Sequence, residues 1–522
     1  MRVATAFEAT ASRFADRLFL DVLPETAAAY AIPPGPITYA AAAAEIGRLR
    51  DAYARAGYGP GHRVGLMLEN RPAFFLHWFA LNGLGVSVVP LNPDLKPAEL
   101  GYLVAHSEIV LGVATAQHLP KLASIPAMEG DAPPPEAARP PPGPFEECAL
   151  LYTSGTTGRP KGCVWSNESF LQTGRWYAAL GGLATLRPGA ERLLTPLPLV
   201  HMNAMAFSAM AMVLTGGCLI QLDRFHPRSW WESLRDSRAT IFHYLGVMPS
   251  MLMAAPADPR DRDHEVRFGF GAGVDRRLHA AFEERFGVTL LEAWAMTETG
   301  AGAAIIAHRE PRHVGTACFG RPDPGAEVRI VDDAGAPCPP EAAGELLVRA
   351  AGADPRAGFF TEYLKDAAAT REAWVGGWFH TGDIVRADAD GYLYFVDRKK
   401  NIVRRSGENI ASAEVESVLR RHALIADVAV CATPDATREE EVLACVVTRT
   451  PIAPERMAEV AEAIVRAALE ELSYYKVPGW VAFVDALPLT ASQKVARGEL
   501  KEMARTLPGT VSCIDTRALK RR

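Results

Sequence analysis

The chain has 522 residues, of which 49% are hydrophobic and 22% are charged, so it can bury several cores, and its length suggests two to four domains. The formal net charge of −6 and the sequence pI near 6.2 give no broad electrostatic reason for binding nucleic acid or a membrane surface. The eight cysteines include no Cys-x-x-Cys pair, which argues against a zinc site or a disulfide framework and is consistent with free thiols in a reducing compartment.

The N-terminus lacks the basic-then-apolar pattern of a secretory signal, so we expect a cytoplasmic protein. Residues 35–125 then alternate helical patterns with short apolar strands, as expected of a parallel sheet covered by helices. The predicted helices are 39–56 and 72–84, and the predicted strands are 63–67 and 86–90.

Two later segments have unusual composition. Residues 131–144 contain runs of proline, which cannot enter the interior of a helix or sheet, so this segment is predicted to be a surface connector. Residues 202–222 carry no charge and reach the length of a membrane span. The Thr-Gly-Gly run at 215–217 divides them into a short helix rich in Ala and Met and an apolar strand, so we expect buried core and no membrane span.

Residues 151–162 form the most informative segment, an apolar strand that runs into a turn rich in hydroxyls and glycines. Glycines allow close backbone approach and positive φ, so successive N–H groups can converge on anionic oxygens, and the lysine at the end adds positive charge. No Gly-Lys-Ser/Thr ends the turn, so it is not a Walker A loop. The segment predicts a polyphosphate site. Its candidate contacts are Thr153, Ser154, Gly155, Thr156, Thr157, Gly158 and Lys161.

This turn resembles the phosphate loop of the adenylate-forming superfamily, which includes acyl-CoA synthetases, luciferases and the adenylation domains of peptide synthetases. Four further segments, at 292–300, 378–400, 404–416 and 487–497, follow in that family's order, so the resemblance spans roughly residues 10–505. Residues 404–409 are similar to the crotonobetaine/carnitine-CoA ligase branch, an analogy that fixes no substrate.

Residues 292–300 read EAWAMTETG and resemble the family's Gly-Tyr-Gly-Met-Thr-Glu-Thr segment. By that resemblance Trp294 lies against the adenine, Thr297 contacts the α-phosphate and Glu298 binds Mg²⁺, a role that suits a hard carboxylate oxygen. Thr156 is the second metal candidate. The two alanines that replace the family's glycines are a departure that narrows the expected acyl pocket. Nucleotide contacts are also assigned to Gly271, Ala272, Gly273, Ala295 and Met296.

Residues 378–383 and 391–400 supply the expected ribose contacts. Asp383 and Arg398 resemble the pair that grips the ribose hydroxyls, because a carboxylate can accept two hydrogen bonds from a diol. Taken without the family, Asp383 is equally well a turn residue after a glycine. By resemblance Lys400 occupies the hinge between two domains.

Residues 404–416 resemble the start of the small C-terminal domain. Ser412 is predicted to be the N-cap of a helix through about Arg421, with Val415 and Leu419 on one face. In CoA ligases of this family the glycine that matches Gly407 lies beside the pantetheine channel; the alternative is a simple turn glycine.

The last motif, at 487–497, resembles the catalytic-lysine segment, and Lys494 is the candidate catalytic lysine, with an arginine three residues later. Two residues depart from the family pattern. Leu489 replaces a lysine, and Gln493 replaces the glycine before the catalytic lysine. If that position needs a positive φ, a glutamine there would be strained.

The acyl pocket is less well defined by the sequence. His201 resembles the family's aromatic or histidine gate and is a catalytic candidate, and His243 belongs to a second wall segment; either is also consistent with a satisfied core histidine. Small and flexible linings suggest a modest, mainly apolar acid. They are Met202, Ala204, Met205, Ala272 and Ala295.

The resemblance implies a multi-domain α/β fold. A large N-terminal domain (1–397) contains parallel-sheet α/β subdomains and a small β-region, and a small mobile α+β C-terminal domain (398–522) carries the catalytic lysine. It implies an AMP-forming acid–thiol ligase, a carboxylate–CoA ligase that uses ATP, Mg²⁺ and coenzyme A. The expected partners are a small carboxylic acid, ATP and CoA, with neither nucleic acid nor a membrane span, in a monomer or homodimer.

Two other classes remain open. An adenylating enzyme that loads a separate carrier protein would share every ATP motif, although no carrier module with its own acceptor serine is apparent after residue 505. A noncatalytic nucleotide- or acyl-binding relative is the second. The presence of Lys494, Glu298 and Asp383 argues against it.

Overall fold

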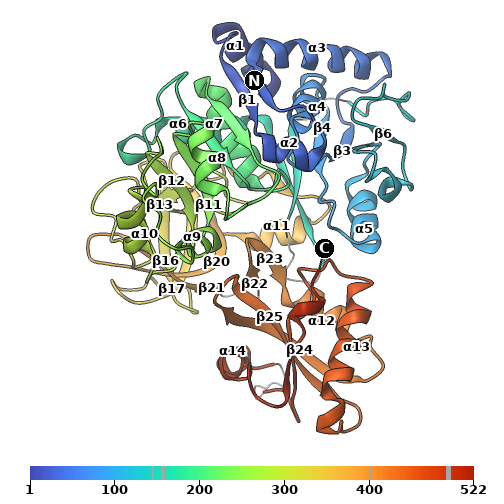
Figure 1. Cartoon of the computed structure of the whole chain (residues 1–522), viewed down its shortest axis with the longest axis vertical. Coiled ribbons are helices and arrows are strands. Elements are labelled where there is room, and N and C mark those ends of the chain that lie inside the picture. Colours follow the sequence, from blue (N-terminus) through green and yellow to red (C-terminus); the bar gives the residue numbers. More distant parts are fainter. Residues whose placement is uncertain (144–145, 154–158, 399–401, 489–494, 522) are drawn as a thin grey trace. The chain divides into compact units, whose positions relative to one another are not determined.

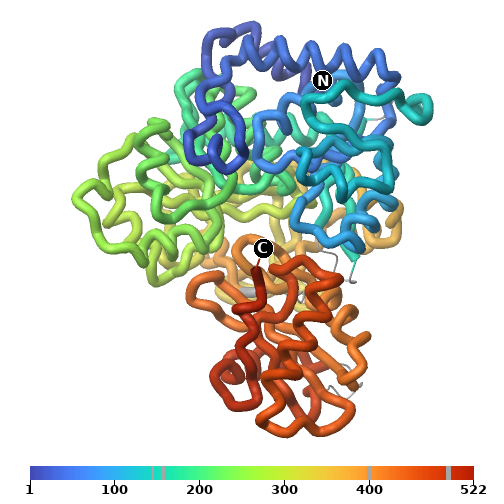
Figure 2. The backbone as a smooth tube through the Cα atoms, turned by 45° about the vertical axis from the view of Figure 1, so that its right-hand side comes forward, coloured from blue at the N-terminus to red at the C-terminus, as the bar shows by residue number. Residues whose placement is uncertain are grey.

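The computed structural model describes residues 1–143, 146–153, 159–398, 402–488 and 495–521, which form two compact units. Unit 1 comprises Met1–Pro93, Val104–Leu151 and Gly162–Asp397, and unit 2 comprises Asp94–Leu103, Tyr152–Lys161 and Arg398–Arg522. The tube of Figure 2 draws the C-terminal part of unit 2 in orange to red. The chain therefore passes into its last compact stretch between Asp397 and Arg398.

In the part of the first sheet before residue 107, strands and helices alternate along the chain (Figure 1). Strand β3 pairs in parallel with both β4 and β5, so the predicted parallel sheet is confirmed. Across the sheet the strands are β18 (Glu362–Tyr363), β8 (Lys161–Ser166), β7 (Glu147–Thr153), β4 (Ser87–Pro90), β3 (Arg63–Met67), β5 (Leu111–Ala114) and β6 (Ala127–Glu129).

The second sheet positions most of the candidate site. Strand β12 pairs in parallel with β11 on one side and β13 on the other, so the carboxyl ends of all three meet at one edge. Across the sheet the strands are β14 (Ile305–Ile306), β13 (Thr289–Trp294), β12 (Phe268–Ala272), β11 (Ile241–Leu245), β9 (Arg192–Thr195), β10 (Cys218–Gln221), β1 (Leu18–Val22) and β2 (Gly35–Thr38).

The third sheet of unit 1 is antiparallel in its described pairs. Its strands in order are β15 (Cys318–Gly320), β21 (Leu393–Arg398), β20 (Trp378–Ala387), β17 (Gly344–Ala350) and β16 (Ala326–Val331), with β19 (Trp374–Val375) paired to β20. Strand β20 carries Asp383.

Helices cover the parallel sheets. Thr38 and Ser166 begin α3 and α6 by accepting hydrogen bonds from backbone N–H groups three residues on. The helices before residue 397 are α1 (Val3–Arg13), α2 (Pro24–Tyr30), α3 (Tyr39–Arg55), α4 (Pro72–Gly83), α5 (Pro97–Ser107), α6 (Asn167–Ala179), α7 (Met210–Thr215), α8 (Trp230–Asp236), α9 (Val247–Met253), α10 (His279–Phe286) and α11 (Ala367–Ala373). Shorter turns are the 3₁₀ helices η1 (Leu119–Leu122) and η2 (Gly182–Ala184) and the π-helix η3 (Asn203–Ala209).

The uncharged segment 202–222 folds as predicted, into η3 and α7 followed by strand β10 of the second sheet. Its Met and Ala side chains are buried in the core of unit 1. Across the described residues, we find no helix whose length and hydropathy would allow it to cross a membrane. Residues 131–143 contain neither helix nor strand, in agreement with the predicted connector, and all eight cysteines are free.

Unit 2 is built on a mixed sheet. Its strands in order are β23 (Glu408–Ala411), β22 (Ile402–Arg405), β25 (Glu439–Thr448), β26 (Trp480–Phe483) and β27 (Cys513–Asp515), with β24 (Ile425–Asp435) paired to β25. Its helices are α12 (Ser412–Leu419), α13 (Met457–Leu469) and α14 (Arg497–Thr506), with the 3₁₀ turns η4 (Pro454–Arg456) and η5 (Arg517–Leu519). Val415, Leu419 and Ile464 pack in one core with apolar residues of β22, β24 and β25.

The predicted N-cap of α12 is wrong. The helix begins at Ser412 itself, the preceding residue is Ala411, and none of the described side chains caps the first turn. The reason is that β23 runs through Ala411, so the backbone enters its first helical turn at Ser412. The hydroxyl of Ser412 is buried and has no hydrogen-bond partner among the described residues. The predicted apolar face is confirmed, because Val415 and Leu419 are both buried.

Candidate active site

Two predicted nucleotide contacts from different sheets of unit 1 lie against each other. Trp294 is the last residue of β13, and Asp383 lies within β20. The indole Nε1 of Trp294 donates a hydrogen bond of 2.9 Å to Oδ2 of Asp383. Both residues are buried, with 6% and 3% of their surface exposed. The indole therefore orients the Asp383 carboxylate at a buried position.

The backbone around Asp383 is fixed by its neighbours on β20 and β17. The N–H of Asp383 donates to the hydroxyl of Thr381, which in turn donates to the carbonyl of Leu346 at 2.7 Å. Gly382 has a φ of 69°, and its N–H donates to Oε1 of Glu345. The positive φ explains the glycine at this position, because a β-carbon would be strained there. Asp383 is therefore held in one direction within a strand.

Glu298 lies in the turn that follows β13 and is buried. The hydroxyl of Tyr363 donates to its Oε1 at 2.9 Å, and its own carbonyl accepts the N–H of Phe360. Burial, and then the charge of Glu298, raise the pKa of Tyr363 above its ordinary value, so this hydroxyl remains a donor at neutral pH. A buried, oriented carboxylate fits Mg²⁺, which usually takes one or two carboxylates together with phosphate oxygens.

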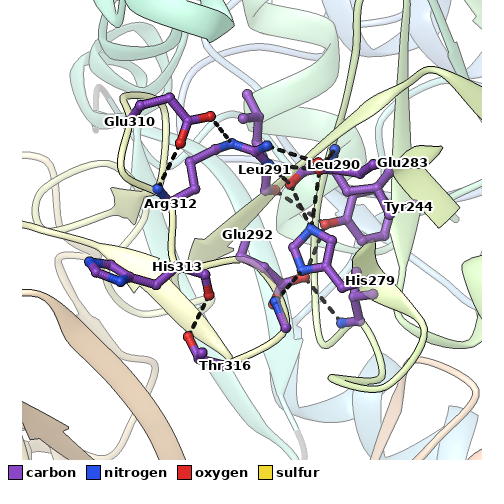
Figure 3. Close-up of polar contacts among 12 residues, drawn as sticks. Tyr244, His279, Glu283, Leu290, Leu291, Glu292, Glu310, Arg312, His313 and Thr316 are labelled. Carbon is purple, nitrogen blue, oxygen red and sulfur yellow. Dashed lines mark hydrogen bonds and ion pairs between the residues drawn. The ribbon is translucent and has the colours of Figure 1, made fainter. Parts of the chain in front are cut away.

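The segment Gly271–Gly273 at the end of β12 is held by a carboxylate that we did not assign to the site from the sequence. Glu292 of β13 accepts the N–H of Gly273 at 3.0 Å and the N–H of Val274 at 3.1 Å. It also accepts a hydrogen bond from the hydroxyl of Tyr244 at 3.0 Å (Figure 3). Burial raises the pKa of Glu292. An acidic residue inside the otherwise apolar strand Thr289–Trp294 was the available signal, because a buried carboxylate needs several donors.

A second network, also visible in Figure 3, holds the start of β13. Arg312 donates through both terminal nitrogens to the two carboxylate oxygens of Glu283, at 2.7 and 2.8 Å, and through Nε to Glu310. The Leu290 carbonyl accepts a further hydrogen bond from Arg312 and lies 3.2 Å from Nε2 of His279. The bidentate geometry fixes β13 at the end opposite Trp294. No sequence signal pointed to this pairing.

The two histidines of the predicted acyl pocket differ in their surroundings. His243 is fully buried, and its ring nitrogens lie 3.1 Å from the hydroxyl of Tyr177 and 2.7 Å from Oδ1 of Asn203. Burial lowers the pKa of His243 to about 3, so the ring is neutral, and the core alternative describes this residue. His201 is half-buried in the segment between β9 and η3, and its assignment as a gate stays a prediction.

The remaining candidates of unit 1 stand at the carboxyl ends of β12 and β13 or directly after them in the sequence. Ala295, Met296 and Thr297 follow Trp294 directly; Ala295 is exposed and the other two are half-buried. Gly271 packs so closely on β11 that a β-carbon would lie 2.3 Å from the carbonyl oxygen of Tyr244. A larger residue at Gly271 would therefore push these two strands apart.

Part of the predicted site lies outside the described residues. Thr153 ends β7 and Lys161 begins β8, so the predicted phosphate turn connects two strands. The candidates outside the described part are Ser154, Gly155, Thr156, Thr157, Gly158, Lys400, Gln493 and Lys494. Arg398 ends β21, and its side chain is also outside the described part.

In unit 2, Gly407 lies at the tip of the hairpin formed by β22 and β23. Arg405 pairs with Glu408 across it, and the two residues between have positive φ, 49° for Ser406 and 85° for Gly407. That combination is typical of the tight two-residue hairpin turn whose twist matches the strands. The turn alternative and the predicted channel role are compatible.

Known protein families and relatives match this chain along nearly its whole length. The profile of the AMP-binding enzyme family matches residues 7–354, and that of the AMP-binding enzyme C-terminal domain matches residues 414–494. Crotonobetaine/carnitine–CoA ligase of Shigella sonnei is 31% identical over 486 residues, covering 88% of this chain and 91% of that protein. Sulfoacetate–CoA ligase of Cupriavidus necator is 32% identical over 492 residues, covering 89% and 92%.

Solved structures agree. A double mutant of o-succinylbenzoate CoA synthetase from Bacillus subtilis has a TM-score of 0.81 at 23% identity, covering 95% of this chain and 98% of that one, which establishes the shared fold. A malonyl-CoA ligase with methylmalonyl-CoA and AMP bound has a TM-score of 0.74 at 27% identity, covering 91% and 97%. The fold and the nucleotide motifs define an adenylate-forming enzyme. The chain belongs to the AMP-binding enzyme family.

Proposed function

We propose that this protein is an ATP-dependent carboxylate–CoA ligase. In the first half-reaction, an oxygen of the substrate carboxylate attacks the α-phosphorus of ATP, forming an acyl-adenylate and releasing pyrophosphate. In the second, the CoA sulfur attacks the acyl carbon, AMP leaves, and the thiol proton is released. Phosphoryl-group displacement of this kind depends chiefly on positioning and charge stabilisation, so no nucleophilic side chain is needed.

The observation that carries the proposal is the hydrogen bond between Trp294 and Asp383. It unites the aromatic motif and the carboxylate motif in one sheltered place, as a site for adenine and ribose requires. We assign Trp294 to the adenine and Asp383, with Arg398, to the ribose hydroxyls. Charged hydrogen bonds to a sheltered diol contribute about 1.5–3 kcal/mol each.

The phosphate end of the nucleotide is assigned to three groups of residues. The turn from Thr153 to Lys161 supplies converging N–H groups, hydroxyls and a lysine, and Thr297 supplies a hydroxyl to the α-phosphate. Glu298 would hold Mg²⁺, with Thr156 as a second ligand, and that ion would offset negative charge on the phosphates. Lys494 is proposed to stabilise the charge on the transferring group. Gly271, Ala272 and Gly273, with Ala295 and Met296, complete the lining.

The second half-reaction is assigned to unit 2. We propose that a C-terminal domain from residue 398 turns about Lys400, so that Lys494 and the turn at Gly407 serve the two half-reactions in sequence. A hinge of this type absorbs large φ/ψ changes at a few residues. Gly407 suits a pantetheine channel because a side chain there would obstruct the thiol.

The acid is proposed to be small. The relatives named above act on crotonobetaine or carnitine and on sulfoacetate, which are small acids that carry a second charged group. The wall segments around η3 are rich in Met and Ala, which favours a modest, largely apolar acyl group. His201 is proposed as a gate to this pocket. We further propose a cytoplasmic enzyme that is a monomer or homodimer.

The test is pyrophosphate release across a panel of short, medium, aromatic, sulfonated and trimethylammonium carboxylic acids, each with and without CoA. Acid-dependent pyrophosphate release together with acyl-CoA formation is the expected result. Pyrophosphate release without any thioester would favour an enzyme that loads a carrier protein. Absence of both, with ATP binding intact, would favour a noncatalytic relative.

A further inference from the structure

The hairpin turn that carries Gly407 is conformationally demanding. Ser406 adopts a φ of 49°, a left-handed conformation that costs a non-glycine residue stability and persists only where neighbours enforce it. The N–H of Ser406 donates to the carbonyl of Arg438 at 3.0 Å, which ties the turn to the loop before β25. The conformation of the turn therefore depends on the contacts that hold two residues. One is Arg405, which directly precedes Ser406, and the other is Arg438.

Arg405 is held by a buried carboxylate that a residue near the C-terminus also contacts. Its Nε donates to Glu441 of β25, at 2.9 and 2.8 Å from the two carboxylate oxygens. Lys520 donates through Nζ to Oε1 of the same carboxylate and to the carbonyl of Val477. The side chains of Lys520 and Glu441 are 1% and 0% exposed. A link therefore runs from Lys520 through Glu441 to Arg405.

The link from Lys520 to Arg405 depends on the charges that surround the buried Glu441 carboxylate. Two basic side chains, Arg405 and Lys520, share the one carboxylate of Glu441. Burial lowers the pKa of Lys520 to about 7, while Glu441 opposes that shift and Arg405 and Arg438 add to it. A β-carbon at residue 479 would lie 2.5 Å from the carboxyl carbon of Glu441, so a larger residue there would displace this carboxylate. Glu441 thus lies between the side chains of Arg405 and Lys520 and contacts both.

A second link from the same C-terminal segment reaches the other support of the turn. Arg517 contacts Oδ2 of Asp435 at 3.2 Å. Oδ1 of Asp435 accepts the N–H groups of Thr437 and Arg438, at 2.9 and 3.0 Å. Asp435 therefore shapes the loop whose Arg438 carbonyl accepts the N–H of Ser406. Strand β27 (Cys513–Asp515) pairs with β26 and anchors this segment to the sheet.

We propose that the segment 513–521, which lies beyond the matched C-terminal family profile, is a positioning element for the turn that carries Gly407. Arg517 and Lys520 act through Asp435 and Glu441 on the two supports of the turn, and their contribution falls on thioester formation with CoA. The proposal rests on the proposed function, in which Gly407 borders the pantetheine channel. Neither residue touches substrate; both act through the hairpin.

The test compares the variants R517M and K520M with wild type in the full chain. We expect faster amide hydrogen exchange in peptides covering 402–411. We also expect kcat/KM for CoA to fall about 10- to 100-fold, the scale for a small misplacement of a binding group, with acid-dependent pyrophosphate exchange within about twofold of wild type. The acid is the one that gives the highest pyrophosphate release in the panel. R466M, which removes an exposed ion pair with Glu462 on α13, is the matched control.

Several outcomes would overturn the proposal. One is unchanged exchange at 402–411 in both variants. Another is altered hydrogen exchange together with normal use of CoA. A third is an equal loss of both half-reactions in R517M at an unchanged melting temperature, because the Arg517 side chain is exposed and its loss would then not be explained by unfolding. If wild type releases no pyrophosphate with any acid, the proposed function fails instead, and hydrogen exchange still decides whether the segment supports the turn.

Discussion

The indole of Trp294 donates a hydrogen bond of 2.9 Å to the carboxylate of Asp383, and this contact joins two motifs that lie on different sheets of unit 1. It orients the carboxylate and also satisfies the indole N–H at a buried position. An unpaired buried N–H would cost about 1–3 kcal/mol, so the pairing stabilises the fold as well as preparing the site. Function and stability can be separated here by substitution.

Replacing Trp294 by Phe keeps an aromatic ring and removes the donor. We expect ATP affinity to fall about tenfold, because Asp383 loses the hydrogen bond that orients it. A hydrogen bond to a charged group contributes roughly 1.5–3 kcal/mol. Titration calorimetry with ATP measures the effect. W374F is the matched control, since the buried Nε1 of Trp374 has no hydrogen-bond partner among the described residues. Equal ATP affinity in W294F and wild type would contradict the assignment.

Glu298→Gln should raise the Mg²⁺ concentration needed for half-maximal pyrophosphate exchange, because an amide oxygen carries no net charge to hold a hard cation. Tyr363→Phe removes the hydroxyl that donates to Glu298 and should produce a smaller shift in the same direction. Mg²⁺ titrations of both variants at saturating ATP provide the measurement. An unchanged Mg²⁺ dependence in E298Q would place the metal elsewhere.

Lys494→Ala should depress acyl-adenylate formation on the order of 10²–10³-fold, the scale for loss of one positioned electrostatic group. Thioester formation from synthetic acyl-adenylate should be largely spared, because the phosphate chemistry is already complete. Pyrophosphate exchange and thioester assays on the same preparation separate the two. A variant equally impaired in both, or normal in adenylation, would refute the role of this lysine.

The network around Glu283 predicts a specific loss of stability in acid. Burial alone would raise the pKa of Glu283, but hydrogen bonds from Arg312 and His279 outweigh it and lower the pKa from 4.5 to about 2. A depressed carboxyl pKa gives stability that is fully present above pH 4.5 and is lost as the pH falls toward 2. E283Q should therefore be less stable than wild type by about 1–3 kcal/mol at pH 6, and the difference should shrink near pH 3.

Denaturant unfolding of wild type and E283Q at pH 6 and pH 3 tests this prediction. E45Q is a useful control, because Glu45 pairs with Arg48 at the surface, where ion pairs contribute little. A difference between E283Q and wild type that does not change with pH would mean that the ion pair with Arg312 does not lower the pKa of Glu283.

The sequence alone determined the family, the alternation of strands and helices and the candidate nucleotide residues. These features are local, because a strand or helix follows from the spacing of apolar residues and a phosphate turn from a short run of Gly, Thr and Lys. The boundaries of α3, α4 and β3 were correct to within one residue for the same reason. The N-cap at Ser412 was wrong because the extent of β23 depends on its pairing with β22.

Only the tertiary structure decided which distant residues meet. Trp294 and Asp383 are partners because β13 and β20 bring them together, and Glu292 holds Gly273 because β12 and β13 pair in parallel. The links from Lys520 to Arg405 depend in the same way on the strands of unit 2. A single sequence contains no pattern for such pairs, since their contact arises from the packing of whole sheets and not from spacing along the chain.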